Sequence, residues 1–151
     1  MKYIKTFEQK NTTVLDLNYK GLTELPELSN TLESLRCFNN DLTELPELPD
    51  NLKKLSCQNN KLTKLPELPD TLDELYCWNN NLTKLPELPD ILKTLGCWYN
   101  DLNELPELPD TLKYLDCDNN NLPYDNLDGY KEWYYENVTH PEIGASKKYN
   151  I

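Results

Sequence analysis

The sequence predicts an α/β-type solenoid that is mostly β, with a parallel sheet on its concave side, extended convex return segments and one C-terminal helix. A 20-residue unit, first seen as LTELPELSNTLESLRCFNND, occurs five times in succession, and most units carry two prolines three residues apart. A fixed period of this length is typical of solenoids, in which each repeat buries its apolar face only against its neighbours. The units begin at Leu22, Leu42, Leu62, Leu82 and Leu102.

Each unit is expected to contribute one short strand. In the first unit, Leu35 and Cys37 are apolar, and they alternate with Ser34, Arg36 and Phe38. This alternation sends every second side chain into the core and the others outward. Since every unit enters its strand in the same direction, the strands are predicted to stack as a parallel sheet.

The return path of each unit is expected to be extended. It carries prolines such as Pro46 and Pro49, three residues apart. Proline fixes φ and removes a backbone donor, which disfavours a helix. The spacing therefore predicts a polyproline-like run on the side opposite the strands.

One asparagine recurs at the turn after every strand. Its amide can donate and accept at once, so a stack of these side chains would satisfy backbone groups that the buried turns leave unpaired. The ladder is formed by Asn40, Asn60, Asn80, Asn100 and Asn120.

One cysteine also recurs in every unit. A metal site, a redox switch and disulfides are possible roles, but a ladder of small buried residues is favoured. Zinc fingers need cysteines closer in the chain, and an odd number cannot pair completely. Reduced thiols would indicate a reducing compartment. The ladder is formed by Cys37, Cys57, Cys77, Cys97 and Cys117.

The pattern LxxLPELPDxLxxLxCxxNxL, which covers roughly Thr12 to Leu122, resembles the leucine-rich repeat family. Its short proline-containing return segment is similar to the bacterial subtype found in type III secretion effectors, and similar repeats occur in amoeba-infecting giant DNA viruses. The resemblance implies a curved solenoid with its strands on the concave side. It also implies that this side binds other proteins.

The whole chain, residues 1–151, is predicted to form a single leucine-rich repeat domain. Residues 1–11 would form an N-terminal cap, because the open end of a solenoid exposes core and a strand edge. Tyr3, Ile4 and Phe7 are the apolar residues available there. Residues 12–122 form the repeats, with a degenerate first turn, and residues 123–151 form a helical cap and tail.

A helix is predicted from Asp125 to Asn137, with Asp125 as its N-cap and Asp128 in its first turn. A terminal cap is the favoured interpretation, and a docking helix for a second chain is the alternative. The predicted apolar face consists of Leu127, Tyr130, Tyr134 and Val138, with Trp133 beside it.

Carboxylates recur along the return segments. A solvated outer face is the favoured interpretation, because charge keeps a repetitive protein soluble. The alternative is an acidic stripe for a cation or a basic partner, although calcium would need carboxylates that converge on one point. The residues are Glu27, Glu47, Glu67, Glu87, Glu107, Asp50, Asp70, Asp90 and Asp110.

The outward strand positions vary between units, and aromatic residues gather there. Exposed tryptophan and tyrosine are typical of binding hot spots, although strand propensity and cross-strand packing could also explain them. Basic residues at one end and acidic residues at the other would orient a partner of mixed charge. The candidate partner-binding residues are Arg36, Phe38, Lys54, Tyr76, Trp78, Trp98, Tyr99, Tyr114, Asp116 and Asp118.

These features predict a protein–protein interaction module that binds a partner polypeptide on the concave face. The alternatives are a peptide or carbohydrate binder that uses stacked aromatic rings, and a structural or self-assembling solenoid. No enzymatic activity, cofactor or metal is expected, since His140 is the only histidine and no nucleotide-binding motif occurs.

The charge and hydropathy of the chain predict its surroundings. A net charge of −11 argues against nucleic acid and anionic membranes as partners. No apolar run approaches the roughly 20 residues of a membrane span. We expect a soluble monomer in the cytoplasm or, if the protein is an effector, in the host cytosol.

Overall fold

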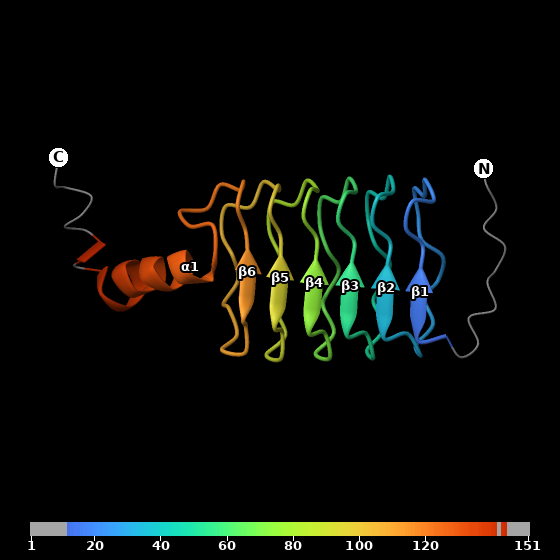
Figure 1. Ribbon diagram of the computed structural model, residues 1–151, viewed down its shortest axis with the longest axis horizontal. Coiled ribbons are helices and arrows are strands. Elements are labelled where there is room, and N and C mark those ends of the chain that lie inside the picture. The colour runs from blue at the N-terminus through green and yellow to red at the C-terminus, as the bar shows by residue number, and fades with distance from the viewer. Residues whose placement is uncertain (1–11, 142, 145–151) are drawn as a thin grey trace.

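Six short strands run side by side along a solenoid in the computed structural model, which describes residues 12–141, 143 and 144 (Figure 1). Every neighbouring pair is parallel, and each Cα pairs with the residue 20 positions later, as Leu35 does with Leu55. The predicted parallel sheet with one strand per turn is confirmed. In sheet order, the strands are β1 (Val14–Asp16), β2 (Ser34–Arg36), β3 (Lys54–Ser56), β4 (Glu74–Tyr76), β5 (Thr94–Gly96) and β6 (Tyr114–Asp116).

The strands are shorter than the predicted alternation. β2 ends at Arg36, although the alternating pattern continues to Phe38. Hydrogen bonds to the next turn nevertheless continue, since the Cys37 amide donates to the Ser56 carbonyl at 2.8 Å. The outward positions after each strand therefore remain in register from turn to turn.

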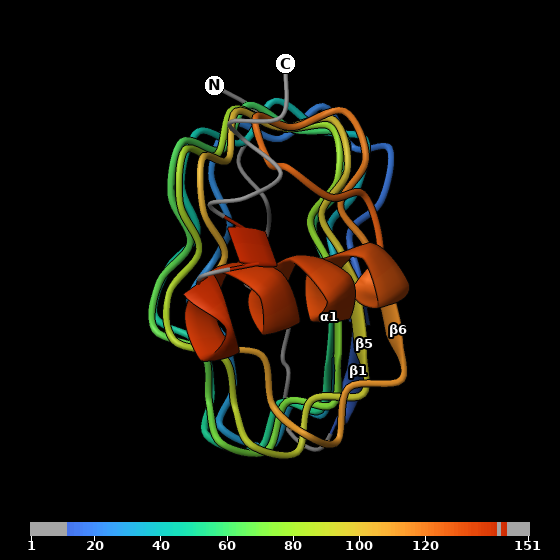
Figure 2. The ribbon, with the colours of Figure 1, turned by 90° about the vertical axis from the view of Figure 1, so that its left-hand side faces the viewer.

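The return segments form the opposite side of the solenoid. Figure 2 looks along the stack and shows the strands on one side of each flattened turn and the return segments on the other. Residues 43–49 contain neither helix nor strand, and the same holds for the equivalent residues in the other complete turns. The absence of helix there agrees with the prediction made from the prolines.

Leucines and cysteines fill the space between the two sides. Within one turn, Leu32, Leu35, Cys37 and Leu42 are fully buried. All five cysteines are buried and free, so the predicted interior ladder is confirmed. Each cysteine follows its strand and fills the narrow part of the core beside the strand leucine.

The asparagine ladder satisfies backbone groups with both ends of each amide, as predicted. Asn80 Oδ1 accepts from the Leu62 amide at 3.0 Å. Its Nδ2 donates to the carbonyls of Cys57 and Cys77 at 3.2 and 3.0 Å. The same arrangement recurs at Asn40, Asn60, Asn100 and Asn120.

The first turn belongs to the stack despite its degenerate sequence. β1 pairs in register with β2, and Leu17 is buried where later turns have cysteine. The predicted N-terminal cap, residues 1–11 with Tyr3, Ile4 and Phe7, lies outside the described residues, as do residues 145–151 of the tail.

The helix predicted at the C-terminal end is present but begins later than expected. α1 (Leu127–Tyr134) continues into the π-helical turn η1 (Tyr135–Thr139). Asn126, not Asp125, is the N-cap, since Asn126 Oδ1 accepts from the Gly129 amide at 3.0 Å. Asp125 lies too early because its carbonyl accepts from the Cys117 amide at 2.9 Å, which ties it to the last turn. The prediction that Asp128 lies in the first helical turn is confirmed.

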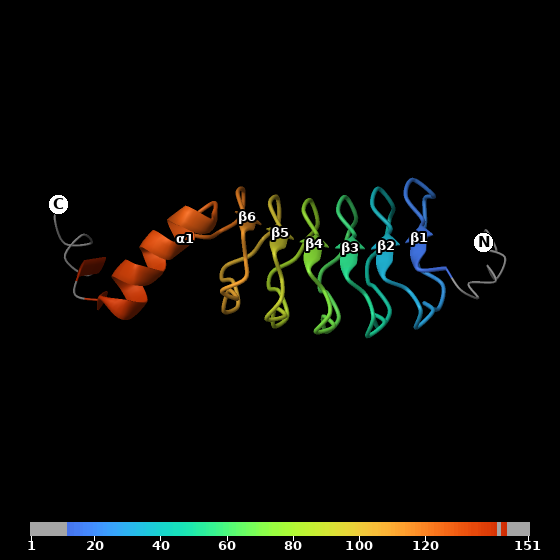
Figure 3. The same ribbon diagram turned by 60° about the horizontal axis from the view of Figure 1, so that its bottom comes forward.

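The face that α1 turns to the solenoid also differs from the prediction. Leu127, Tyr130 and Trp133 pack against the core, whereas Tyr134 and Val138 are exposed. Figure 2 shows α1 crossing the end of the last turn, and the view in Figure 3 shows it continuing beyond β6. Only the first part of the predicted face therefore meets the core.

A buried tyrosine that the sequence analysis missed joins α1 to the last turn. Tyr124 is 7% exposed, and its ring centroid lies 5.2 Å from that of Tyr130 and 5.4 Å from that of Trp133. An antiparallel bridge between Asp116 and Asn126 adds a backbone contact to β6. Together these contacts cover core and strand edge at this end.

Candidate functional site

Two stacked tryptophans form the centre of the outward-facing side of the sheet, which we call the sheet face. Trp78 follows β4 and Trp98 follows β5, each by two residues. Their ring centroids are 4.7 Å apart and their planes differ by 11°. Both side chains are half-buried. Packing against each other restricts the rotamers of both rings, so that they present a preorganised apolar surface.

A glycine in β5 provides the space for this arrangement. A Cβ atom at Gly96 would lie 2.8 Å from Trp98 Cζ3 and 3.2 Å from Tyr76 Cδ1. The rings of Trp98 and Tyr76 therefore lie directly over the Gly96 backbone, which is buried. We call Tyr76, Trp78 and Trp98 the aromatic cluster. The sequence analysis missed the role of Gly96.

Replacing this glycine is expected to disrupt the cluster. In Gly96→Ala, the new methyl group would overlap the Trp98 ring, which has to move because the backbone beneath it is held by the sheet. We expect a loss of about 1–3 kcal/mol in the free energy of unfolding and a changed near-ultraviolet circular dichroism spectrum. Ser56→Ala is a control at the equivalent position of β3. An unchanged spectrum for Gly96→Ala would contradict this packing.

The acidic end of the sheet face is internally hydrogen-bonded. Tyr114 Oη donates to Asp116 Oδ2 at 3.3 Å. Partial desolvation raises the pKa of Tyr114, and the negative charge of Asp116 raises it further. Asp118 accepts from the amide and the side chain of Asn119 at 2.7 and 2.6 Å. Asp118 remains exposed, whereas Asp116 is half-buried.

The basic end is weaker than the sequence suggested. Lys54 Nζ lies 2.6 Å from Glu74 Oε1, one strand away. The hydrogen bond with Glu74 raises the pKa of Lys54. Arg36 is exposed and forms no ion pair with any residue that the structure describes. The positive end of the predicted charge gradient therefore depends mainly on Arg36. The sequence analysis missed the ion pair of Lys54 with Glu74, which opposite charges at paired positions of neighbouring strands could have indicated.

Two further aromatic groups lie away from the cluster. Phe38 contacts Tyr19 edge-on, with ring centroids 5.3 Å apart. Tyr19 and Tyr99 have positive φ angles of 55° and 51°, at a position where the other turns have asparagine. Asparagine tolerates this region better than bulky residues do. Tyr19 was missed, although its alignment with the candidate Tyr99 could have revealed it.

The cysteines and the histidine do not form a nucleophilic pair in the described residues. Burial raises the pKa of Cys37 and of Cys117 to about 12, so these thiols stay protonated at neutral pH. His140 lies after α1, with its ring 4.4 Å from that of Tyr135. Within residues 12–141, 143 and 144, no group of three histidine, cysteine, aspartate or glutamate side chains is placed to hold a metal ion.

The outer face carries the predicted carboxylates in exposed positions, such as Glu67, Asp70, Glu87 and Asp90. They form no ion pairs among the described residues. Their exposure agrees with the predicted solvated outer face. In the part of the chain that the structure describes, no helix is long and apolar enough to cross a membrane.

Comparisons with known proteins find similarity to leucine-rich repeats. A family model described as Leucine Rich Repeat matches residues 51–72. Among solved structures, the LRR domain of a Shigella effector is 43% identical with a TM-score of 0.71, and the match covers 72% of this chain and 50% of that one. A comparison with curated proteins yields no match.

Two structures of YopM are also similar. YopM from Yersinia enterocolitica WA-314 is 41% identical with a TM-score of 0.58, and the match covers 74% of this chain and 30% of that one. The leucine-rich effector YopM from Yersinia pestis is 32% identical with a TM-score of 0.62, with coverages of 74% and 44%. The chain thus spans half or less of each solved chain. Similarity to giant-virus repeats stays a prediction.

Proposed function

Since this chain is a leucine-rich repeat protein similar to bacterial effector repeats, we propose that it binds a partner polypeptide on its sheet face. The observation that carries the proposal is the stacked pair of Trp78 and Trp98 beside Tyr76. Half-buried aromatic rings that are already ordered give a partner apolar contact area at a small entropic cost.

Polar groups around the aromatic cluster support a polypeptide as the ligand. Arg36 is exposed towards one end, and Asp118 is exposed towards the other. A charged rim around an apolar centre is the usual composition of a protein interface. In this proposal, the aromatic cluster supplies most of the affinity and the rim sets the orientation of the partner.

A carbohydrate or a short peptide is the second candidate, and the same stacked rings favour it. Sugars bind through a free aromatic face, and here the two indoles use one face each on the other. This leaves less free aromatic surface than two separate rings would offer. A structural solenoid that self-associates through its ends is the third candidate.

The remaining expectations follow from the same proposal. We propose a non-catalytic monomer that works in a reducing compartment, because its buried thiols are unpaired. That compartment is the cytoplasm or, for an effector, the host cytosol. Nucleic acid and anionic membranes are not expected as partners of a chain with a net charge of −11.

Removing both stacked tryptophans tests the proposal. We would use wild type and Trp78→Ala/Trp98→Ala to capture proteins from cell lysate, after circular dichroism has shown that both are folded. Tyr135→Ala is the control, since Tyr135 is an exposed aromatic residue outside the sheet face. A partner retained by wild type and by Tyr135→Ala is expected to be lost by the double variant, because hot-spot truncations cost about 2 kcal/mol or more each.

The other outcomes separate the candidates. Equal retention of a partner by all three proteins would contradict binding through the aromatic cluster. A sugar that changes the fluorescence of Trp78 and Trp98 while no protein is retained would favour the carbohydrate alternative. A molecular mass that rises with protein concentration would favour the self-associating solenoid.

A further inference from the structure

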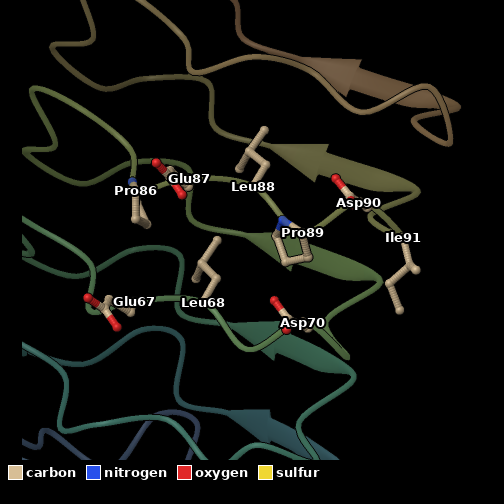
Figure 4. A pocket seen from close by; sticks show the side chains of 9 residues that line it. All are labelled: Glu67, Leu68, Asp70, Pro86, Glu87, Leu88, Pro89, Asp90 and Ile91. Carbon is tan, nitrogen blue, oxygen red and sulfur yellow. The ribbon is translucent and has the colours of Figure 1, made fainter.

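The outer face contains a groove between two adjacent return segments. Figure 4 shows Leu68, Leu88 and Pro89 along its floor, with Glu67 and Glu87 on one side. The groove has a volume of about 910 Å³. It is on the side of the solenoid opposite the sheet face, so it is separate from the site proposed above (Figure 2).

Ile91 interrupts a ladder of hydrogen bonds beside this groove. Thr71 Oγ1 donates to the Asp50 carbonyl at 2.6 Å and to the Leu52 carbonyl at 2.9 Å. Thr111, two turns further on, makes the same two bonds to the turn before it. Ile91 occupies the equivalent position between them but has no hydroxyl group. The other side chains at this position, Thr31 and Asn51 included, donate at least one hydrogen bond to the turn before them. At Ile91 the solenoid therefore has an apolar side chain in place of a hydrogen-bond donor.

That side chain does not serve the core. Ile91 is 45% exposed, whereas the repeating leucines at the centre of each turn are fully buried. Figure 4 shows it at the edge of the groove, beyond the carboxylates of Asp70 and Asp90. The next groove along the outer face is smaller, at about 610 Å³, and Thr111 follows its last lining residue, Asp110. Of these two grooves, the larger one is therefore the one that is lined by Ile91, where the neighbouring turns have threonine.

The charge around the groove indicates what could occupy it. Glu67 and Glu87 lie on one side and Asp70 and Asp90 on the other (Figure 4), and none forms an ion pair with a described residue. A second copy of a chain with net charge −11 would meet like charges there. Charge complementarity therefore favours a basic occupant.

We propose that this groove docks an extended basic segment of another polypeptide. One aliphatic side chain of that segment would pack against Leu68 and Leu88 on the floor, and another against Ile91 at the edge. Lysine or arginine residues on either side of it would pair with the carboxylates of the two rims. The proposal does not depend on binding at the aromatic cluster.

Labelled peptides and one variant test the proposal by fluorescence anisotropy. The probe is the peptide KLKLK, and the comparison peptides are KAKAK and ELELE. We expect wild type to bind KLKLK more tightly than either comparison peptide. Ile91→Thr should weaken the binding of KLKLK at least fivefold, because it removes the apolar edge of the groove. Trp78→Ala/Trp98→Ala should leave it unchanged.

Ile91→Thr is expected to fold well, since threonine restores the two hydrogen bonds made by Thr71 and Thr111. Its thermal midpoint should therefore equal or exceed that of wild type. Thr111→Ile is the matched gain-of-function variant and should strengthen KLKLK binding by adding an apolar edge to the neighbouring groove.

Three results would overturn the proposal. The first is equal affinity of wild type and Ile91→Thr for KLKLK, or no binding at all. The second is equal affinity for KLKLK and KAKAK, which would mean attraction by charge alone. The third is self-association of wild type that Ile91→Thr abolishes, because a second copy would then be the occupant.

Discussion

Raising the pH above about 9 is expected to unfold the protein steeply under reducing conditions. Cysteine thiols ionise near 9.0, but burial raises the pKa of Cys37 and Cys117 to about 12 and that of the other three still further above the ordinary range. The unfolded chain therefore releases protons that the folded chain retains. Each thiol thus makes a contribution to the free energy of unfolding that is fully present below pH 9 and is lost as the pH rises towards the pKa of the folded thiol.

The size of the effect follows from the number of thiols. At a pH where the unfolded thiol is ionised and the folded thiol is not, each cysteine lowers the free energy of unfolding by about 1.4 kcal/mol per pH unit, or about 7 kcal/mol per unit for all five together. A domain is stable by only about 5–15 kcal/mol. Most of this stability should disappear within about two pH units. Burial also raises the pKa of Tyr124 to about 12, which acts in the same direction above pH 10.

Chemical denaturation at a series of pH values, with a phosphine reductant present, would measure this dependence. Cys57→Ala/Cys77→Ala is the informative variant: it lowers stability at every pH, yet its slope above pH 9 should be smaller by about 3 kcal/mol per unit. Ser56→Ala changes a neighbouring polar residue outside the cysteine ladder and should keep the full slope. Equal slopes for the cysteine variant and wild type would show that other groups control alkaline unfolding.

The periodic part of this fold could be predicted because equivalent residues in successive turns have equivalent surroundings. Five copies of one cysteine and one asparagine are five observations of the same environment. The burial of the cysteines and the two-sided hydrogen bonding of the asparagines followed from these repeats. The strands ended earlier than the alternation suggested, although backbone hydrogen bonds to the next turn continue beyond them, as from the Cys37 amide to the Ser56 carbonyl.

The ends and the site were harder to predict because their residues occur once. Tyr124 is buried only because α1 crosses the last turn, and nothing in its neighbourhood repeats. The predicted N-cap at Asp125 was wrong since backbone pairing with Cys117 takes precedence there. On the sheet face, Gly96 gives no signal in the sequence beyond lacking a side chain, and its role appears only once Trp98 lies over it.

Removing one amide from the centre of the asparagine ladder is expected to be among the most damaging single changes. Asn80 is 8% exposed, accepts from the Leu62 amide and donates to the carbonyls of Cys57 and Cys77. In Asn80→Ala, the Leu62 amide loses its side-chain partner in a place that water reaches poorly. The Cys57 and Cys77 carbonyls each lose one of two donors, since Asn60 and Asn100 still donate to them. A buried unsatisfied amide costs about 1–3 kcal/mol and each lost hydrogen bond about 1 kcal/mol, so we expect a loss of about 3 kcal/mol in the free energy of unfolding.

Urea denaturation of Asn80→Ala, Asn81→Ala and Asn120→Ala would measure the effect. Asn81 is the matched control: it is the next residue and is exposed, so its replacement should change the free energy of unfolding by no more than about 0.5 kcal/mol. Asn120→Ala should fall between the two, because Asn120 makes equivalent bonds but is only half-buried. Equal losses for Asn80→Ala and Asn81→Ala would contradict the ladder.

The position of Asn80 within the stack increases its effect. Each turn of a solenoid is stabilised only by its two neighbours. A defect at Asn120 can be relieved by local opening of the last turn together with α1, which leaves the earlier turns folded. A defect at Asn80 lies between β4 and β5, and opening it would separate Trp78 from Trp98. We therefore expect Asn80→Ala to lower both global stability and binding on the sheet face, whereas Asn120→Ala should spare binding.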